Sequence, residues 1–156
     1  MRLDNARRME VLQRQHDAVV ARTDAVMRAS GGLLYPSATT AIVAHRQAWF
    51  THKIGQLLTA QGIVLLGCTD IGAEAVGWAI AEQPSLVVVD DTLAMVSSQH
   101  VIREIRHYCP QTIIAAQVPH NDRAGAMFEA GADAVHTRAV PHDLAVEDML
   151  RLLIAS

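Results

Sequence analysis

The stretch that decides the fold is residues 84–91, which read PSLVVVDD. Four consecutive apolar residues, three of them β-branched, follow a proline and a serine and lead to the carboxylates Asp90 and Asp91. A strand that is apolar at every position, instead of at alternate positions, is typical of a parallel sheet covered by helices on both faces. The stretch therefore predicts a central parallel strand with Asp90 at its carboxyl end.

Short apolar runs of the same kind recur on both sides of this strand, and each is followed by a segment with helical spacing. Strands are expected over residues 40–44, 63–67, 86–89, 112–118 and 134–136. Helices are expected over residues 49–60, 73–82, 101–108, 123–130 and 142–154. This alternation, with right-handed crossovers, predicts an α/β fold: a flavodoxin-like, doubly wound parallel sheet of five strands in the order 2-1-3-4-5.

The first thirty residues differ from the rest in charge and spacing. Residues 1–30 hold six arginines against four acidic residues, whereas residues 31–156 hold seven basic against twelve acidic residues. We expect one amphipathic helix over 1–30, a linker over 31–39, and the α/β domain over 40–156. The helix has a heptad-like seam formed by Met9, Leu12, Val19 and Val26, with His16 and Thr23 in the same register. Such a helix either dimerises the chain as a coiled coil or packs against its own domain.

Composition excludes several classes of protein. The chain has 156 residues, of which 51% are hydrophobic and 19% charged, so intrinsic disorder is excluded. A net charge of −3 offers no basic face for nucleic acid, and no apolar run is long enough for a membrane span. The two cysteines, Cys68 and Cys109, have no close spacing, and no signal peptide is visible, so we expect a location in the cytoplasm. The heptad-like helix leads us to expect a homodimer.

Four phrases carry a resemblance to a known family: LLTAQGIVLLG at 57–67, PSLVVVDD at 84–91, IREIRHYCPQTIIA at 102–115 and MFEAGADAVHTRAVPHDL at 127–144. Residues 40–155 resemble the CheY-like receiver domain of two-component response regulators, most closely the NarL/LuxR type. The resemblance implies a carboxylate after the third strand that accepts a phosphoryl group, and an acidic pair after the first strand that holds Mg²⁺. It also implies a hydroxyl ending the fourth strand and a lysine ending the fifth, both contacting phosphoryl oxygens.

Only the phosphoacceptor position matches this pattern. Asp90 stands at the acceptor position, but the acidic pair falls on His45 and Arg46. The hydroxyl position falls on Gln117 and the lysine position on Arg138. Because Mg²⁺ relies on carboxylate oxygens, we expect no metal here and a contact of His45 and Arg46 with Asp90 in its place. The expected function is a degenerate, phosphorylation-independent receiver without enzyme activity, acting through a protein partner or a separate output domain.

Three alternatives stay open for the same residues. The chain is a conventional phosphoacceptor, with Asp91 helping Asp90 to bind Mg²⁺ and Arg138 replacing the lysine. Or the vacated acidic pocket, with His45, Arg46, Asp90 and Gln117, binds a small molecule. Or histidines bind zinc together with Asp90, in which case the ligands would come from His45, His120, His136 and His142. The plainer interpretations are a solvated loop carboxylate at Asp91, a tolerated replacement at Gln117 and scattered surface histidines.

Overall fold

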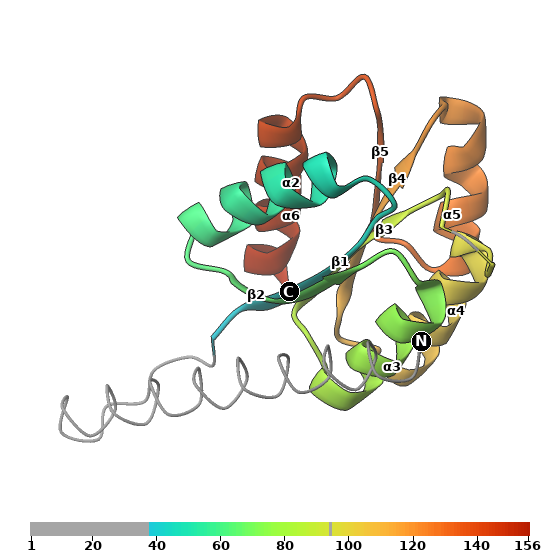
Figure 1. Cartoon of the computed structure of the whole chain (residues 1–156), viewed down its shortest axis with the longest axis horizontal. Helices are drawn as coiled ribbons and strands as arrows, with labels where there is room; N and C mark the ends of the chain where they lie inside the picture. Colours follow the sequence, from blue (N-terminus) through green and yellow to red (C-terminus); the bar gives the residue numbers. More distant parts are fainter. Residues whose placement is uncertain (1–37, 94) are drawn as a thin grey trace, which may run out of the picture.

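The computed structural model describes residues 38–93 and 95–156. Its core is a parallel sheet of five strands in the order β2-β1-β3-β4-β5 (Figure 1). The strands are β1 (Thr40–Ala44), β2 (Val64–Thr69), β3 (Leu86–Asp90), β4 (Ile113–Val118) and β5 (Ala134–Thr137). The helices are α2 (Ala48–Ala60), α3 (Gly72–Glu82), α4 (Ser98–Tyr108), the 3-10 helix η1 (Asn121–Arg123), α5 (Ala124–Ala130) and α6 (His142–Ala155).

Helices cover both faces of the sheet, α2 and α6 on one side and α3, α4 and α5 on the other (Figure 1). Alternate residues of β3 serve the two layers: Leu86 and Val88 pack under α2 and α6, and Val87 and Val89 pack under α3, α4 and α5. All five residues of β3 are buried. This two-sided burial is the physical reason why the strand is apolar at consecutive positions.

The predicted fold, strand order and strand–helix alternation are confirmed. The largest difference is at α4, which begins at Ser98 instead of residue 101 because the hydroxyl oxygen of Ser97 accepts the amide hydrogen bond of His100 at 3.2 Å. A side-chain cap of this kind satisfies an otherwise free amide of the first turn. The unpredicted helix η1 also precedes α5, which moves the start of α5 to Ala124.

Several predictions lie outside the described residues. They are the amphipathic helix over residues 1–30, its seam of Met9, Leu12, Val19 and Val26, and most of the linker over 31–39. Within the described part of the chain, no helix is long and apolar enough to cross a membrane.

Candidate functional site

The site lies where β1, β3 and β4 end, at one edge of the sheet. Parallel pairing sets Ala44 beside Val89, and Asp90 beside Gln117. His45 follows β1 directly, so the register brings His45, Asp90 and Gln117 together although they are far apart in sequence. Ligand sites of doubly wound folds form at this edge.

His45 is buried and held at both ring nitrogens. Its Nδ1 accepts a hydrogen bond from the backbone amide of Gln47 at 3.0 Å, and its Nε2 lies 2.7 Å from Oε1 of Gln117. Because Nδ1 is the acceptor for an amide, the ring proton is on Nε2, which donates to Gln117. Burial lowers the pKa of His45 below its usual 6.5, and this effect exceeds the opposing influence of the Gln117 hydrogen bond and the Asp90 charge. The imidazole is therefore neutral near pH 7.

Asp90 is 1% exposed and only half satisfied. The hydroxyl of Thr92 donates to its Oδ2 at 2.5 Å, whereas its Oδ1 is buried without a hydrogen-bond partner. Oδ1 faces Nε2 of His45 at 3.7 Å. The imidazole thus stands next to the acceptor-position carboxylate, on the side from which the acidic pair of a conventional receiver is expected to bind Mg²⁺.

The expected contact between Arg46 and Asp90 is wrong. Arg46 is exposed, and its Nη1 reaches the backbone carbonyl of Thr92 at 3.5 Å. Successive side chains of an extended segment point to opposite sides. Since His45 points inward to Asp90, Arg46 points outward. At neutral pH His45 is uncharged and Arg46 does not contact Asp90, so neither residue places a positive charge on that carboxylate.

Asp91 is neither a solvated loop carboxylate nor a free metal ligand. Its side chain is 6% exposed and accepts two hydrogen bonds from Arg123, Nε to Oδ2 at 2.9 Å and Nη2 to Oδ1 at 3.0 Å. The hydroxyl of Ser98 adds a third at 2.6 Å to Oδ1. Burial alone would raise the pKa of Asp91, but Arg123 and Ser98 outweigh it and hold the pKa below its usual value. Both oxygens accept hydrogen bonds, and these bonds connect the end of β3 to α4 and to η1.

The residues present do not fit Mg²⁺. The positions expected to supply oxygen ligands hold an imidazole and an outward arginine, and the neighbouring carboxylate of Asp91 is engaged by Arg123. Mg²⁺ prefers oxygen ligands in near-octahedral geometry. Oδ1 of Asp90 is buried without a hydrogen-bond partner, and a ring nitrogen, not a second carboxylate, lies before it.

The zinc alternative is contradicted. Among residues 38–93 and 95–156 no group of three His, Cys, Asp or Glu side chains could hold a metal ion. His136 instead pairs with Asp148 at 2.8 Å, His120 is exposed, and His142 packs against aromatic rings. Arg138 is exposed after β5, close enough for its charge to disfavour protonation of His45.

Aromatic rings extend the site to the surface. The ring of Phe50 stacks on His45 with centroids 3.9 Å apart. His142 at the start of α6 lies 5.1 Å from Phe50 and 5.6 Å from Trp49, measured between ring centroids. We refer to these four residues, His45, Phe50, His142 and Trp49, as the ring cluster. It joins the buried edge of the sheet to Trp49, which is 61% exposed.

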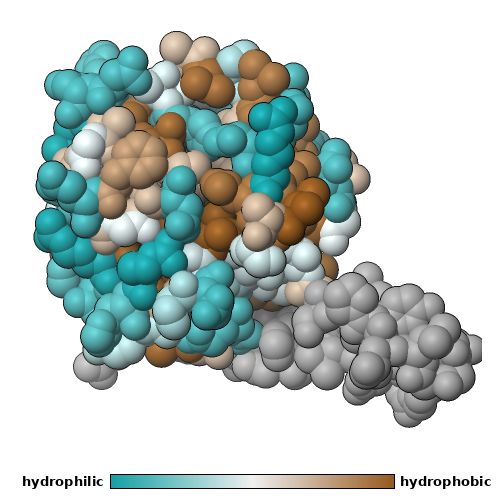
Figure 2. Space-filling view, turned by 180° about the vertical axis from the view of Figure 1, so that it is seen from behind, coloured by the Kyte–Doolittle hydropathy of each residue, from teal (hydrophilic) through white to brown (hydrophobic). Residues whose placement is uncertain are grey.

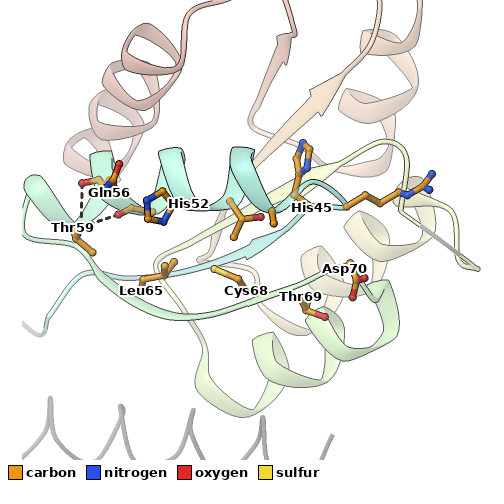
Figure 3. Close-up of a pocket in the computed structure, with 12 residues that line it drawn as sticks. His45, His52, Gln56, Thr59, Leu65, Cys68, Thr69 and Asp70 are labelled. Atoms are coloured by element: carbon orange, nitrogen blue, oxygen red, sulfur yellow. Dashed lines mark hydrogen bonds between the residues drawn. The ribbon is translucent and has the colours of Figure 1, made fainter. Parts of the chain in front are cut away.

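A groove of about 690 Å³ lies between α2 and the edge strand β2 (Figure 3). Its walls include Thr51, His52 and Gln56 from α2, and Leu65 and Cys68 from β2. His45 and Arg46 border one end, but Asp90 and Gln117 are not among its lining residues. The cavity is therefore not the vacated acidic pocket. Burial raises the pKa of the Cys68 thiol to about 11, so that this thiol is not a nucleophile at neutral pH.

Sequence reasoning missed four members of the site. Thr92, Ser98 and Arg123 satisfy the two aspartates, and Phe50 carries the stacked ring. For Arg123 the sequence offers no signal, because its partner lies 32 positions away. For Thr92, the pattern of a hydroxyl two positions after an aspartate at a strand end was available.

No family model and no curated protein matches the chain. Solved structures match it in fold. The response regulator receiver domain protein (CheY-like) from Methanospirillum hungatei JF-1 aligns with a TM-score of 0.70 at 15% identity, over 76% of this chain and 96% of that one. The signal receiver domain of NarL from Mycobacterium tuberculosis aligns with a TM-score of 0.70 at 18% identity, over 78% and 100%. A LuxR-family two-component response regulator from Aurantimonas sp. SI85-9A1 aligns with a TM-score of 0.69 at 20% identity, over 76% and 87%.

These matches and the sheet order define the class of fold: the described domain has the fold of response-regulator receiver domains, the NarL/LuxR type included. The predicted receiver resemblance is confirmed at the level of the fold.

Proposed function

We propose that this chain is a regulatory module of signal transduction that has the receiver fold but does not depend on phosphorylation of Asp90. One observation carries the proposal. The neutral imidazole of His45 faces the unpartnered oxygen of Asp90 and is fixed there by Gln117 and Gln47. Phosphoryl transfer to a carboxylate needs cations that neutralise charge on the phosphoryl oxygens, and the ring that faces Asp90 here is uncharged near pH 7.

Gln117 supports the same proposal. In the family that the chain resembles, a hydroxyl at this position reports the presence of a phosphoryl group. Here the amide oxygen of Gln117 is engaged with His45 at 2.7 Å, and the residue is buried. A buried side chain that is fixed by a hydrogen bond favours a single conformation of the carboxyl-terminal edge of the sheet.

The module would then act through protein contacts. Large apolar side chains are exposed on several helices, and they include Trp49 on α2, Tyr108 on α4, Phe128 on α5 and Leu144 and Ile154 on α6. Figure 2 shows that apolar side chains also gather near the middle of one face, bordered by hydrophilic ones. A contiguous apolar patch such as the one in Figure 2 favours binding to another protein, whereas single exposed apolar side chains do not by themselves. The N-terminal seam of Met9, Leu12, Val19 and Val26 is the proposed contact of a homodimer.

The function proposal is tested by Mg²⁺ titration of the full chain, followed by two-dimensional ¹⁵N NMR. A conventional receiver serves as positive control, and Asp90→Asn as the matched variant. We expect no saturable shift at the amides of residues 90–92 at Mg²⁺ concentrations that saturate the control. Saturable shifts that disappear in Asp90→Asn would overturn the proposal. Homodimerisation is tested separately by sedimentation of the full chain beside Leu12→Glu, and a monomer in the native chain would refute that part.

A further inference from the structure

His45 occupies a position with two competing hydrogen-bond partners for one ring nitrogen. Nε2 now donates to Oε1 of Gln117 at 2.7 Å, and the unpartnered Oδ1 of Asp90 lies only about one ångström further, at 3.7 Å. The opposite nitrogen, Nδ1, is the acceptor for the amide of Gln47, the residue that precedes α2. The tautomer of this ring therefore connects β4 with the start of α2, beside the carboxylate that ends β3.

We propose that His45 is a proton-operated switch: protonation transfers its Nε2–H hydrogen bond from Gln117 to Asp90 and releases the amide of Gln47. A proton from solvent would bind the Nδ1 lone pair, which now receives the Gln47 N–H. Two N–H donors would then face each other, so that hydrogen bond cannot persist. The imidazolium is attracted by the buried carboxylate, and a small ring movement shortens the 3.7 Å separation to a charge-assisted hydrogen bond.

Burial and the charges around His45 decide how readily the ring takes up a proton. Asp90 on β3 favours the protonated ring, whereas Arg138 after β5 and His142 on α6 disfavour it. Arg46, the next residue, points outward to Thr92, and the facing residue of β4 is the uncharged Gln117. Burial is the largest influence and also disfavours protonation, so the ring takes up its proton below its usual pKa of 6.5.

The ring cluster provides a route from this event to the surface. Phe50 stacks on the imidazole at 3.9 Å with an interplanar angle of 19°, so a movement of that ring changes the packing of Phe50. Phe50 also contacts His142 at the start of α6 and the exposed Trp49 of α2. Figure 3 shows His45, just after β1, with its ring directed away from Thr69 at the end of β2 and from Asp70, the residue that follows it. Protonation of His45 is therefore expected to change the surface formed by the first turns of α2 and α6.

This inference rests on the proposed function, because it takes Asp90 as unmodified, but its test is independent of phosphorylation. The full chain is titrated with acid from above pH 7 and followed by ¹⁵N NMR of the His45 imidazole and of the Gln47 amide. We expect Nδ1 of His45 to change from an unprotonated to a protonated nitrogen below pH 6.5 while the chain stays folded. The Gln47 amide should lose its hydrogen-bonded shift with the same midpoint.

Two variants separate His45 from its neighbour His142. In His45→Gln the Gln47 transition should disappear, whereas in His142→Asn it should persist. The fluorescence emission of Trp49, measured in a Trp78→Phe background, should change with pH in the native chain and in His142→Asn. In His45→Gln this change should disappear. A Gln47 amide that stays unchanged until the chain unfolds would overturn the proposal, and so would a transition that survives in His45→Gln and disappears in His142→Asn. Should His45→Gln fail to fold, the imidazole and amide signals of the native chain decide the outcome by themselves.

Discussion

Oε1 of Gln117 lies 2.7 Å from Nε2 of His45, and this hydrogen bond joins the ends of β4 and β1 across the end of β3. Asp90, at the end of β3 between these two strands, has an almost fully buried side chain. The bond needs a long amide at position 117, which a hydroxyl residue could not replace at this distance. The departures from the receiver pattern at His45 and Gln117 therefore depend on each other.

Gln117→Leu should destabilise the domain. The substitution removes the acceptor of the buried Nε2–H of His45, whose nearest remaining acceptor, Oδ1 of Asp90, lies 3.7 Å away. A buried polar group without a hydrogen bond at normal distance costs about 1–3 kcal/mol. The free energy of unfolding in urea is the measurement, and Gln111→Leu at an exposed position is the matched control, with an expected change within about 0.5 kcal/mol. Equal effects of the two substitutions would show that the hydrogen bond has no role in stability.

Arg123→Ala should also lower stability, by a smaller amount. The variant removes two hydrogen bonds from the carboxylate of Asp91, although Ser98 still donates one. Because the side chain of Arg123 is 40% exposed, solvent screens the pair and the expected loss is only about 1 kcal/mol. Arg103→Ala, at an exposed position of α4, is the control. A loss in Arg123→Ala no larger than in the control would contradict the fastening role of Asp91.

Stability should fall between pH 6.5 and mildly acidic pH because of His45. In the unfolded chain this histidine takes up a proton near pH 6.5, whereas burial keeps it neutral in the folded chain to lower pH. Over that interval the unfolded state binds more protons, so falling pH favours unfolding. The difference between native and His45→Gln unfolding free energies should be constant above pH 6.5 and should diminish below it. A pH-independent difference would show that the folded and unfolded chains protonate His45 alike.

Two glycines of α3 should respond oppositely to alanine. A Cβ at Gly72 would lie 2.7 Å from Cγ2 of Val101, so Gly72→Ala forces α3 from α4 and should cost about 1–3 kcal/mol. Gly77 is exposed, and a Cβ there meets nothing within 4 Å. Gly77→Ala should therefore stabilise the helix by about 0.5–1 kcal/mol. Thermal unfolding of both variants tests the pair, and stabilisation by both would contradict the close approach of α3 to α4.

The fold could be predicted from the sequence because its main determinant is local. Runs such as LVVV are apolar at consecutive positions, and this pattern is typical of a strand that is covered by helices on both faces. The position of Asp90 followed at once, because a strand that ends at a carboxylate places it at the edge where ligand sites form. The proximity of His45 to Asp90 follows from parallel register for the same reason.

The remainder of the site depended on long-range geometry that no local pattern reports. Arg46 and His45 are adjacent and both basic in type, and only the direction of the chain after β1 decides which one points inward. The pairing of Asp91 with Arg123 required the position of η1, a short helix without a sequence signal of its own. The sequence favours a tolerated replacement at Gln117, because its hydrogen bond to His45 depends on the positions of two side chains far apart in the chain.

The central claim is that Asp90 is not a phosphoacceptor in practice. The most direct test is the intact mass of the full chain after incubation with acetyl phosphate and Mg²⁺, beside the Asp90→Asn variant and a conventional receiver. The account predicts no added phosphoryl group under conditions that label the conventional receiver. One phosphoryl group on the native chain, absent from Asp90→Asn, would contradict it and would show that His45 and Gln117 move aside.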